Sequence, residues 1–484
     1  MEATSVTKRA ITIAWLAAAI LWGFWWICDT RLDLRAAQEH SRSAAGFAPL
    51  FPSGTVQWKE VDRVTLKQGE SVRWEWVRGD GGWRQVIPFE FPIDGAMVDE
   101  QLALLAALSA RTVVPGIDSE VAAESIAADG PVVSLHWGNA TTSIGLGRRL
   151  PAGCAWVAVD GAPRVARDDI HGAFLGADLK RWRRTSLFER ADVECECLAS
   201  TAVAADGSVQ RLEVRRDGPS WKLVSPVTTR ADREAVERWL DALARARATG
   251  FVVDRPTDVG AFGLADPLAT VEIRSVSRTR GADGAVVITP VVERLEIGAA
   301  IRAGASEHFA RLAAHPEAIM EIDAAAVAAA MPPALSLVDA TATGVRPADI
   351  RAIRLAPKDG TIARLERAGA DWTLTDERGL RAASSRAVEG LLSRICGDRA
   401  TDIASGSAPS ELFIGLIAVE GFDGRVLAEF SVSREVDAGR FGIDDHSGVL
   451  RIFPKSSALY LDGADYEVRD PSRGPLVPPV PLPR

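Results

Sequence analysis

The amino-acid sequence predicts an α+β fold made of three related repeat units behind one N-terminal transmembrane helix. Each unit is expected to contain antiparallel β-hairpins and one packed helix. The main observation is a block that occurs twice, W-x4-P-x5-D followed by apolar residues at helical spacing. The second observation is the alternation of apolar and polar residues, interrupted by turn residues, around each block. Repetition at a fixed offset is typical of scaffolds built from stacked units.

The first block begins at Trp83 and the second at Trp221, and equivalent residues lie 138 positions apart (221 − 83 = 138; 232 − 94 = 138). The proline is expected to end a strand because it lacks the backbone N–H that a ladder needs. The aspartate is expected to cap the helix that follows. The markers are Trp83, Pro88 and Asp94 with the ladder Val98, Leu102 and Leu105, and Trp221, Pro226 and Asp232 with the ladder Val236, Leu240 and Leu243.

A third, eroded copy begins at Trp372, which follows Trp221 at an offset of 151 (372 − 221 = 151). Glu377 stands where the first two copies have proline, and the helix ladder shifts along the chain to Val388, Leu391, Leu392 and Ile395. Terminal copies of repeat proteins are often atypical. The third unit is therefore expected to keep the hairpin, the tryptophan and the helix and to lose the proline-defined turn.

The other elements are expected in the same order in each unit: strands before the block, a strand and a closing hairpin after the helix, and a short helix at the end. In the first unit they are 64–66, 71–76, 130–135, 143–147, 155–159 and 168–175. In the second they are 211–214, 271–273, 294–298, 308–312 and 323–330, with a turn at Phe262, Gly263, Leu264 and Pro267. In the third they are 353–355, 427–430 and 439–443.

Length and charge bound the organisation of the chain. Its 484 residues are enough for about three domains at roughly 150 residues each. The net charge of −9 argues against a nucleic-acid partner, which usually needs a concentrated basic face. The predicted boundaries are a cytoplasmic N-terminus at 1–9, an anchor at 10–28, a juxtamembrane stalk at 29–55, repeat units at 56–190, 191–345 and 346–470, and a proline-rich tail at 471–484.

The segment 10–28 contains no charged residue and is long enough to span most of a hydrocarbon core of about 30 Å as a helix. Lys8 and Arg9 precede it and Asp29 follows it, so the N-terminus is expected inside and the rest of the chain outside the cytoplasm. A cleaved signal peptide is the alternative, but no good A-x-A cleavage site follows the apolar run. A lipoprotein at Cys28 is disfavoured because Ile27 is bulky.

Four further cysteines, Cys154, Cys195, Cys197 and Cys396, are expected outside the cytoplasm. The pair Cys195 and Cys197 lies between glutamates and suggests a soft-metal site. Three or four convergent ligands are needed for such a site, and no histidine lies near the pair, so no metal site is predicted. A disulfide from Cys154 to one of the pair remains an alternative to buried free thiols, which are favoured.

No other pattern predicts catalysis or a cofactor. The six histidines are scattered, and the chain has no nucleophile elbow, no phosphate-binding loop and no complete dinucleotide fingerprint. Residues 444–446, Asp-Asp-His, are interpreted as a solvated hairpin loop rather than a carboxylate–imidazole dyad. The basic run 181–184 is interpreted as a solvated helix face with its tryptophan inward rather than a surface for lipid headgroups or an acidic partner.

Two further features have alternative interpretations. The repeated tryptophans are expected to anchor the core of their own repeats, because each stands beside a strand-ending turn. The alternative is an aromatic platform that stacks on sugar rings. The tail at 471–484 is rich in proline and favours an extended polyproline II conformation. It is either a docking peptide for an extracytoplasmic partner or a disordered end.

The chain resembles the bacterial family of the domain of unknown function DUF4340. The resemblance rests on the two W-x4-P-x5-D blocks, on the turn Phe262, Gly263, Leu264 and Pro267, and on the segment Leu50, Phe51 and Pro52 after the anchor. It covers about residues 10–345, with an eroded echo to 470. It implies a membrane-anchored extracytoplasmic protein, often an accessory part of ABC-type or gliding-motility-type export systems. It implies no catalytic residue.

The sequence therefore predicts a non-catalytic, single-pass membrane protein that serves as a scaffold or accessory subunit of an ABC-type exporter or other envelope machinery. Its expected partner is an inner-membrane protein complex, for example an ABC-type permease. No enzyme activity, cofactor or nucleic-acid partner is predicted, and the oligomeric state stays open. The alternative function is a module that binds cell-wall or surface polysaccharide.

Overall fold

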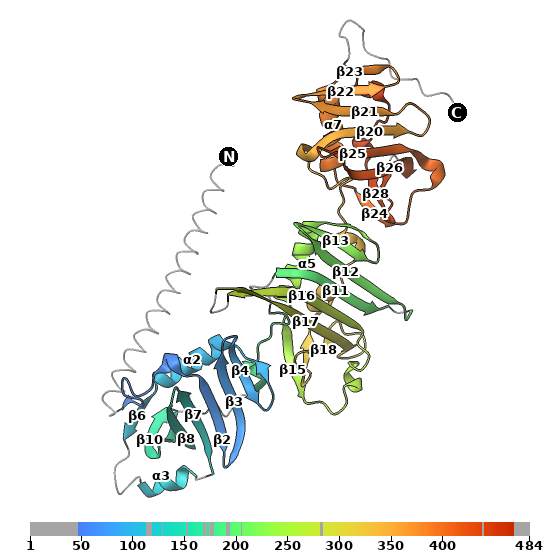
Figure 1. Cartoon of the computed structure of the whole chain (residues 1–484). Helices are drawn as coiled ribbons and strands as arrows, with labels where there is room; N and C mark the ends of the chain where they lie inside the picture. Colours follow the sequence, from blue (N-terminus) through green and yellow to red (C-terminus); the bar gives the residue numbers. More distant parts are fainter. Residues whose placement is uncertain are drawn as a thin grey trace, which may run out of the picture. The chain divides into compact units, whose positions relative to one another are not determined.

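The structure, a computed structural model, describes residues 47–468 except for gaps at 113–118, 128, 152, 168–170, 172–173, 175–178, 190–193, 205, 281–283 and 438–439. The chain divides between Arg184 and Thr185 into two compact units (Figure 1). The predicted anchor at 10–28, most of the stalk at 29–55 and the tail at 471–484 lie outside the described residues. Among the residues that are described, no helix combines the length and the apolar character needed to cross a membrane.

The described part of the chain is mostly β, with 50% strand, 20% helix and three large antiparallel sheets. The predicted α+β class is therefore wrong. The prediction assumed that each repeat consists of separate hairpins and a helix that contributes about as much to the fold as the hairpins do. In the structure the hairpins of each repeat pair side by side into one continuous sheet, because antiparallel neighbours satisfy each other's backbone N–H and C=O groups. The helices occupy short stretches between these strands.

The first unit contains one ten-stranded sheet with the order β1-β6-β10-β9-β8-β7-β2-β3-β4-β5. Helix α2 (Gly95–Ala106) contacts β4, and α3 (Ser119–Ser125) contacts β10. The strands are β1 (Ala48–Pro49), β2 (Arg63–Gln68), β3 (Ser71–Gly79), β4 (Gly82–Ile87), β5 (Phe91–Pro92), β6 (Ser109–Thr112), β7 (Pro131–Trp137), β8 (Ala140–Leu150), β9 (Cys154–Val159) and β10 (Ala162–Arg167).

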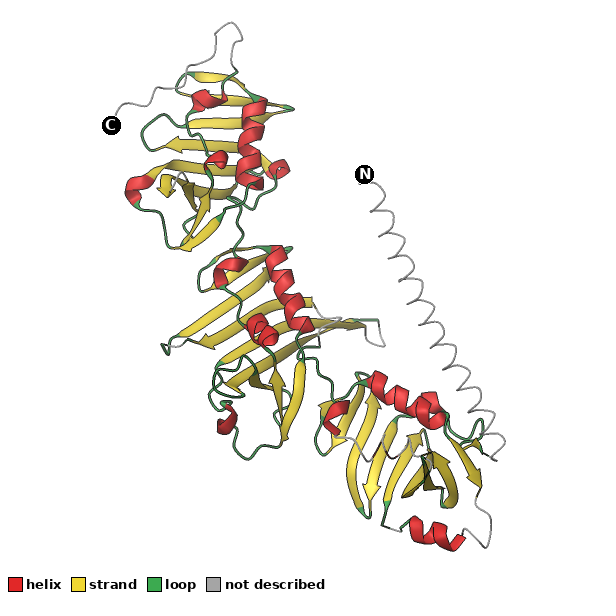
Figure 2. Ribbon diagram, turned by 180° about the vertical axis from the view of Figure 1, so that it is seen from behind, coloured by secondary structure: helices red, strands yellow, loops and turns green. Residues whose placement is uncertain are grey.

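The second repeat forms a nine-stranded sheet with the order β14-β13-β12-β11-β16-β17-β18-β19-β15. Helices α5 (Arg233–Arg245) and α6 (Ala324–Ala330) contact each other on one side of it (Figure 2). The strands are β11 (Glu194–Val203), β12 (Val209–Asp217), β13 (Ser220–Ser225), β14 (Thr229–Ala231), β15 (Ala248–Asp254), β16 (Ala269–Arg280), β17 (Val286–Ala300), β18 (His308–Leu312) and β19 (Ala318–Ile322).

The third repeat forms a second nine-stranded sheet with the order β23-β22-β21-β20-β25-β26-β27-β28-β24. Helix α7 (Ser385–Gly397) lies across one face and contacts β22 (Figure 2). The strands are β20 (Ile350–Pro357), β21 (Ala363–Ala368), β22 (Asp371–Asp376), β23 (Gly379–Ala383), β24 (Asp402–Ser405), β25 (Phe413–Gly421), β26 (Val426–Asp437), β27 (Arg440–Asp444) and β28 (Val449–Phe453).

The three sheets share one strand order. Each begins at a short edge strand before the long helix (β5, β14 or β23), continues through the tryptophan strand (β4, β13 or β22), and ends at the strand after that helix (β6, β15 or β24). Only the first sheet has an additional strand, β1, beyond this end. The shared topology that the 138-residue offset predicts is therefore present in the first two repeats, and the third repeat has it as well.

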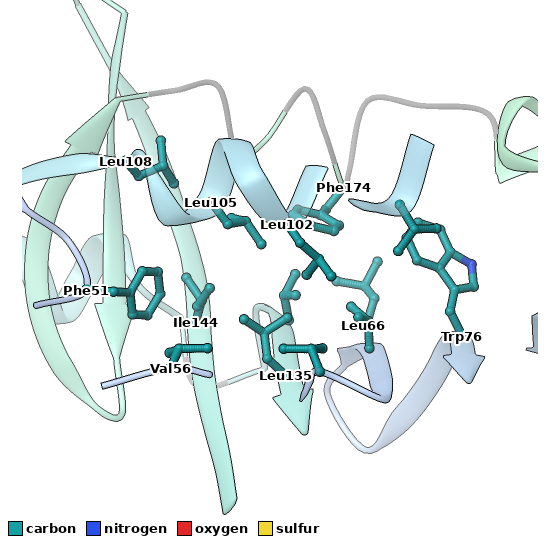
Figure 3. Packing of buried hydrophobic residues seen from close by; sticks show 14 of the residues in the cluster. Phe51, Val56, Leu66, Trp76, Leu102, Leu105, Leu108, Leu135, Ile144 and Phe174 are labelled. Atoms are coloured by element: carbon teal, nitrogen blue, oxygen red, sulfur yellow. The ribbon is translucent and has the colours of Figure 1, made fainter. Parts of the chain in front are cut away.

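Capping and a buried ladder explain where the long helices begin and which face they bury. The Asp94 side chain accepts hydrogen bonds from the N–H groups of the first turn of α2, and Asp232 accepts one from Ala235 N (3.0 Å). In the third repeat Ser384 takes this role for α7, which the sequence analysis did not anticipate. The apolar ladder of α2 packs on the strands beneath it, as Figure 3 shows for Leu102 and Leu105 opposite Leu66, Leu135 and Ile144.

The repeated tryptophans are buried, as predicted. Only 3% of Trp83, 4% of Trp221 and 3% of Trp372 is exposed. An arginine five positions earlier in the sequence covers each ring from the neighbouring strand, at 5.5, 4.9 and 5.0 Å from the ring centroid, a cation–π distance. These arginines are Arg78, Arg216 and Arg367. The indoles thus belong to the core, and the guanidinium group of an arginine on the adjacent strand covers each of them.

Each repeat closes on itself by the same contact. A residue at the end of the repeat pairs with the residue just before the helix cap: Arg183 with Ile93, Val338 with Ala231, and Glu467 with Ala383. The N–H of the capping residue also donates to the carbonyl of the residue before the pair, at 2.8, 2.8 and 2.7 Å. Because the closing residues end one repeat and the next begins at once, successive repeats are joined by very short connections.

Gly263 explains the turn at Phe262, Gly263, Leu264 and Pro267. It has a φ of +67°, and a Cβ there would lie 2.6 Å from the backbone N of Ala299 on β17. Only glycine permits this conformation and this approach without strain. Leu264 is buried beside it, so the turn closes the second sheet over β17.

Gly263→Ala is therefore expected to destabilise the second repeat by about 2–5 kcal/mol, which combines about 1–2 kcal/mol for the left-handed conformation with about 1–3 kcal/mol for overpacking. Urea unfolding measures it. Gly284→Ala is the matched control, because Gly284 also has a positive φ (+81°) but open space around its Cβ position. Equal losses for the two variants would show that close packing on β17 contributes nothing.

Candidate functional site

The largest groove among those described lies where the second and third repeats meet, inside the unit that begins at Thr185. Its volume is about 1200 Å³. Two predicted markers, Trp221 and Asp232, line it together with residues that the sequence analysis did not single out. The main charged residues of the groove are Arg233, Glu234, Asp339, Arg346, Asp349, Arg399 and Asp423.

A connection of two residues joins the repeats at this groove. Val338 pairs with Ala231 of the second repeat, and Thr341 pairs with Arg399 of the third. Only Asp339 and Ala340 lie between them, so the connection is held at both ends. The groove is therefore positioned by strand pairing on either side rather than by a loose linker.

Arg451 on β28 is the centre of the contact between the repeats. Its side chain has no solvent exposure. Its Nε donates to the backbone carbonyl of Asp339 (2.7 Å), and one Nη donates to the hydroxyl of Thr229 on β14 (3.1 Å). The other Nη lies 2.9 Å from the Asp445 carboxylate, an ion pair without hydrogen-bond alignment. One buried guanidinium thus joins β14 of one repeat, the connection, and the β27–β28 turn of the other.

Arg230 on β14 makes the reciprocal contacts from the second repeat. Its Nε donates to the Asp339 carboxylate (3.2 Å), and one Nη lies 3.5 Å from the Asp445 carboxylate. The other Nη donates to the carbonyls of Thr341 and Ala342 at 2.9 and 3.1 Å. A planar guanidinium suits such multiple contacts because its donors have a fixed geometry. The two arginines therefore share one carboxylate oxygen of Asp445, Oδ2.

Asp232 has two roles at the rim. One carboxylate oxygen caps α5, and the other forms an ion pair with Arg399 of the third repeat. Burial raises the pKa of Asp232, but the Arg399 guanidinium and the Ala235 N–H outweigh it, so its pKa lies below the ordinary value. The hydrogen bond to Asp232 raises the pKa of Arg399. The marker predicted as a helix cap is thus also a contact between repeats.

The pKa values of Asp445 and Arg451 are both lowered at the contact. Burial raises the pKa of Asp445, but Arg451, the Ser447 side chain and Arg230 outweigh it, and its pKa is lowered. Burial and repulsion from Arg230 lower the pKa of Arg451 despite the attraction of the aspartates. Each charged group has a structural partner, so the arrangement holds two repeats together and leaves no activated nucleophile at the contact. We call Arg230, Asp232, Asp339, Arg399, Asp445 and Arg451 the joint.

Acid is expected to weaken the joint. The folded-state pKa values of Asp232 and Asp445 are lowered, so their contribution to stability is present above the unfolded pKa of about 3.9 and is lost as the pH falls below it. The free energy of unfolding should therefore be lower at pH 3 than at pH 7. Asp445→Asn should remove part of this dependence. An identical pH profile for wild type and Asp445→Asn would contradict the assignment.

The other predicted markers lie apart from the joint. Trp83, Pro88 and Asp94 belong to the first unit, where Pro88 follows a cis peptide bond, as Pro226 does in the second repeat. Trp372 lines a separate groove at the far edge of the third repeat. The structure thus brings only Trp221 and Asp232 into the site.

The four cysteines after the predicted anchor lie among the described residues. Cys154, Cys195, Cys197 and Cys396 form no disulfide there, and burial raises the pKa values of Cys197 and Cys396. No cluster of three His, Cys, Asp or Glu side chains able to hold a metal occurs in the described part.

The structure also shows the surroundings of the two charged runs, 444–446 and 181–184. Asp444 accepts the backbone N–H of His446 (2.8 Å) in the β27–β28 turn, so 444–446 forms the predicted hairpin turn rather than a dyad. The predicted solvation is wrong for Asp444, which is buried, and for Asp445, whose side chain is 12% exposed. In the run 181–184, Trp182 is buried as predicted. Arg183 is buried too, over Phe89 and Phe91, so the predicted solvated face is wrong at that position.

The sequence analysis did not identify the arginines of the site. The sequence contains a repeated pattern for the arginines that cover the tryptophans, but none for the arginines of the joint. The arginine–tryptophan pairs extend the repeated block to R-x4-W, a spacing visible in all three copies. The joint has no such signal, because Arg230 and Arg451 are isolated arginines 221 positions apart (451 − 230 = 221).

Comparison with known proteins gives one match. The family model described as domain of unknown function (DUF4340) matches residues 221–412. No curated protein and no solved structure matches the chain. The match begins at the tryptophan of the second repeat and ends in the third, so it differs from the predicted span of 10–345 and encloses the connection, Arg230, Asp232 and Arg399. Residues 221–412 of this chain therefore belong to the family of the domain of unknown function DUF4340.

Proposed function

We propose that the protein is a non-catalytic scaffold or accessory subunit outside the cytoplasm, serving an ABC-type exporter or another envelope machinery. The observation that carries the proposal is the joint. Six charged residues of the two repeats and their connection pair with one another where the repeats meet, and three of them, Asp232, Asp339 and Arg399, line the groove there. Each is used in a contact that holds the repeats together. Such an arrangement supports a shape that must persist while a partner binds. The pKa shifts of Asp232, Asp445 and Arg399 arise largely from these mutual contacts, whereas the groups with shifted pKa values in a catalytic site face the substrate.

The membrane attachment in this proposal rests on the sequence. The uncharged segment 10–28, with Lys8 and Arg9 before it and Asp29 after it, supports a single-pass anchor with the N-terminus inside and the repeats outside the cytoplasm. A tethered chain of three domains of one fold presents its surfaces close to integral membrane proteins. The proposed partner is therefore an inner-membrane complex, for example an ABC-type permease.

Polysaccharide binding is the less favoured function. It requires tryptophan faces that are open to sugar rings, and the three repeated indoles are buried beneath arginines. The groove at the joint offers mainly ion-paired side chains, which would have to break their contacts to bind sugar hydroxyls.

Topology is tested with a reporter that is active only outside the cytoplasm, fused after Arg484 in the full chain. The proposal expects activity, and it expects the variant with Lys8→Glu and Arg9→Glu to lose part of it because the positive flank is removed. A stable fusion without activity would contradict the topology, and a mature N-terminus beyond Asp29 would contradict the anchor.

The partner is tested by affinity capture of the full chain from detergent-solubilised membranes, followed by mass spectrometry. A bait carrying only residues 1–55 is the control for the anchor. We expect enrichment of the membrane subunits of one transport or envelope complex over this control. The same proteins on both baits would contradict the role of the repeats. Retention of wall polysaccharide without such subunits would favour the alternative.

A further inference from the structure

The three equivalent edge strands have different surroundings. In the first repeat, β5 is two residues long and contains Pro92, which blocks pairing at that edge. In the second repeat, β14 is covered by the third repeat, since Thr229 and Arg230 contact residues beyond the connection. In the third repeat, β23 is five residues long, and it is the last strand of its described sheet.

The face around β23 is equivalent to the face of the second repeat that holds the joint. Register fixes the equivalence, because Ala231 pairs with Trp221 and Ala383 pairs with Trp372. The charged joint residues of the second repeat are replaced by small or apolar ones in the third. Arg230 corresponds to Ala382, Asp232 to Ser384, and Asp339 to Val468.

This terminal face is more apolar than an outer surface of a repeat array normally is. Leu380 is 72% exposed and Val468 is 59% exposed. Both line an open groove of about 690 Å³ beside Trp372. Terminal repeats usually carry a polar outer face for solubility. β23 contains no proline, lysine or bulge and pairs with β22 in unbroken register. Its one charged residue, Arg381, is ion-paired with Asp376 and Glu467.

We propose that this face, which we call the terminal face, binds a second copy of the chain through a twofold contact in which β23 pairs antiparallel with β23 of the other copy. A twofold axis makes a strand antiparallel to its own copy, so an identical edge is its own partner. The equivalent face of the second repeat is already covered by a domain of the same fold, which is the precedent within the molecule.

The charges beside the edge support a self-complementary contact. Arg378 and Arg381 form ion pairs with Asp376 and Glu467, so the cluster contains two cations and two anions. The cluster is therefore neutral overall, so two copies of it can approach each other without net repulsion. Leu380 projects from the part of β23 that precedes the closing pair at Ala383, where the edge is open in the described structure.

Crosslinking of the full chain, purified in detergent, tests the contact directly. A photo-crosslinking benzophenone amino acid replaces Leu380, and the irradiated protein is separated by mass and mapped by peptide mass spectrometry. The expected product has twice the chain mass, with the link between position 380 and residues 371–383 of the other copy. A link to the chain's own tail at 471–484, a link to a different protein, or no product would each overturn the proposal.

Dissociation measured by light scattering during size-exclusion chromatography gives a second test. Leu380→Asp places two carboxylates near the twofold axis and is expected to raise the dissociation constant at least about tenfold, as for a central interface residue. Ile362→Asp is the matched control, since Ile362 is 56% exposed in the same repeat and does not line the groove. A monomeric wild type, or equal effects of the two variants, would overturn the proposal.

Discussion

Replacing Arg451 with alanine is expected to destabilise the unit that contains the second and third repeats by about 3–5 kcal/mol, the usual cost of breaking a buried ion pair. The substitution removes one of the two positive charges that pair with the Asp445 carboxylate. It also removes the hydrogen-bond donor to the Thr229 hydroxyl and the donor to the backbone carbonyl of Asp339. Urea unfolding followed by tryptophan fluorescence measures the loss, because Trp221 lies beside the joint.

Two further variants separate the contact from a general packing defect. Met320 occupies the position of Arg451 in the second repeat, since Met320 pairs with Phe251 as Arg451 pairs with Ile403. Arg451→Met should therefore fit sterically. Combined with Asp445→Asn, it should recover a substantial part of the loss, because no buried charge is then left uncompensated. Strictly additive effects of the two substitutions would contradict an ion pair between Arg451 and Asp445.

Replacing Trp221 with alanine is expected to cost about 3–5 kcal/mol, as for other buried aromatic residues reduced to alanine. Trp221 is 4% exposed, packs within the second repeat, and has the Arg216 guanidinium 4.9 Å from its ring centroid. The free energy of unfolding measures the effect. Trp221→Phe keeps an aromatic ring beneath Arg216 and should lose less than half as much. An unchanged melting temperature for Trp221→Ala would contradict its role in the core.

The repeated elements could be predicted because their signals are local. Trp83 and Trp221 precede a strand end, and Asp94 and Asp232 precede apolar residues at helical spacing, so the strand, the cap and the helix follow from a few residues. The fold class was wrong because strand pairing between distant hairpins is not local. For example, β11 pairs with β16 over residues that are about 70 positions apart, as between Thr201 and Thr270 (270 − 201 = 69).

The candidate site could not be predicted for a related reason. Asp232 has a local signal as a helix cap, but its second role depends on Arg399, which lies 167 positions later. Arg451 stands in the apolar strand Val449–Phe453, where a single arginine has no periodic pattern that marks it as a contact. Its burial becomes meaningful only when β14 and the connection are placed beside it.

The second and third repeats are expected to behave as one body held by the joint. Hydrogen–deuterium exchange of the full chain, followed during thermal unfolding, tests it most directly. Peptides from 211–225 and from 440–453 should lose protection at the same temperature in the wild type, and at different temperatures in Arg451→Ala. Separate loss of protection in the wild type would contradict the claim, because the joint would then not couple the two repeats.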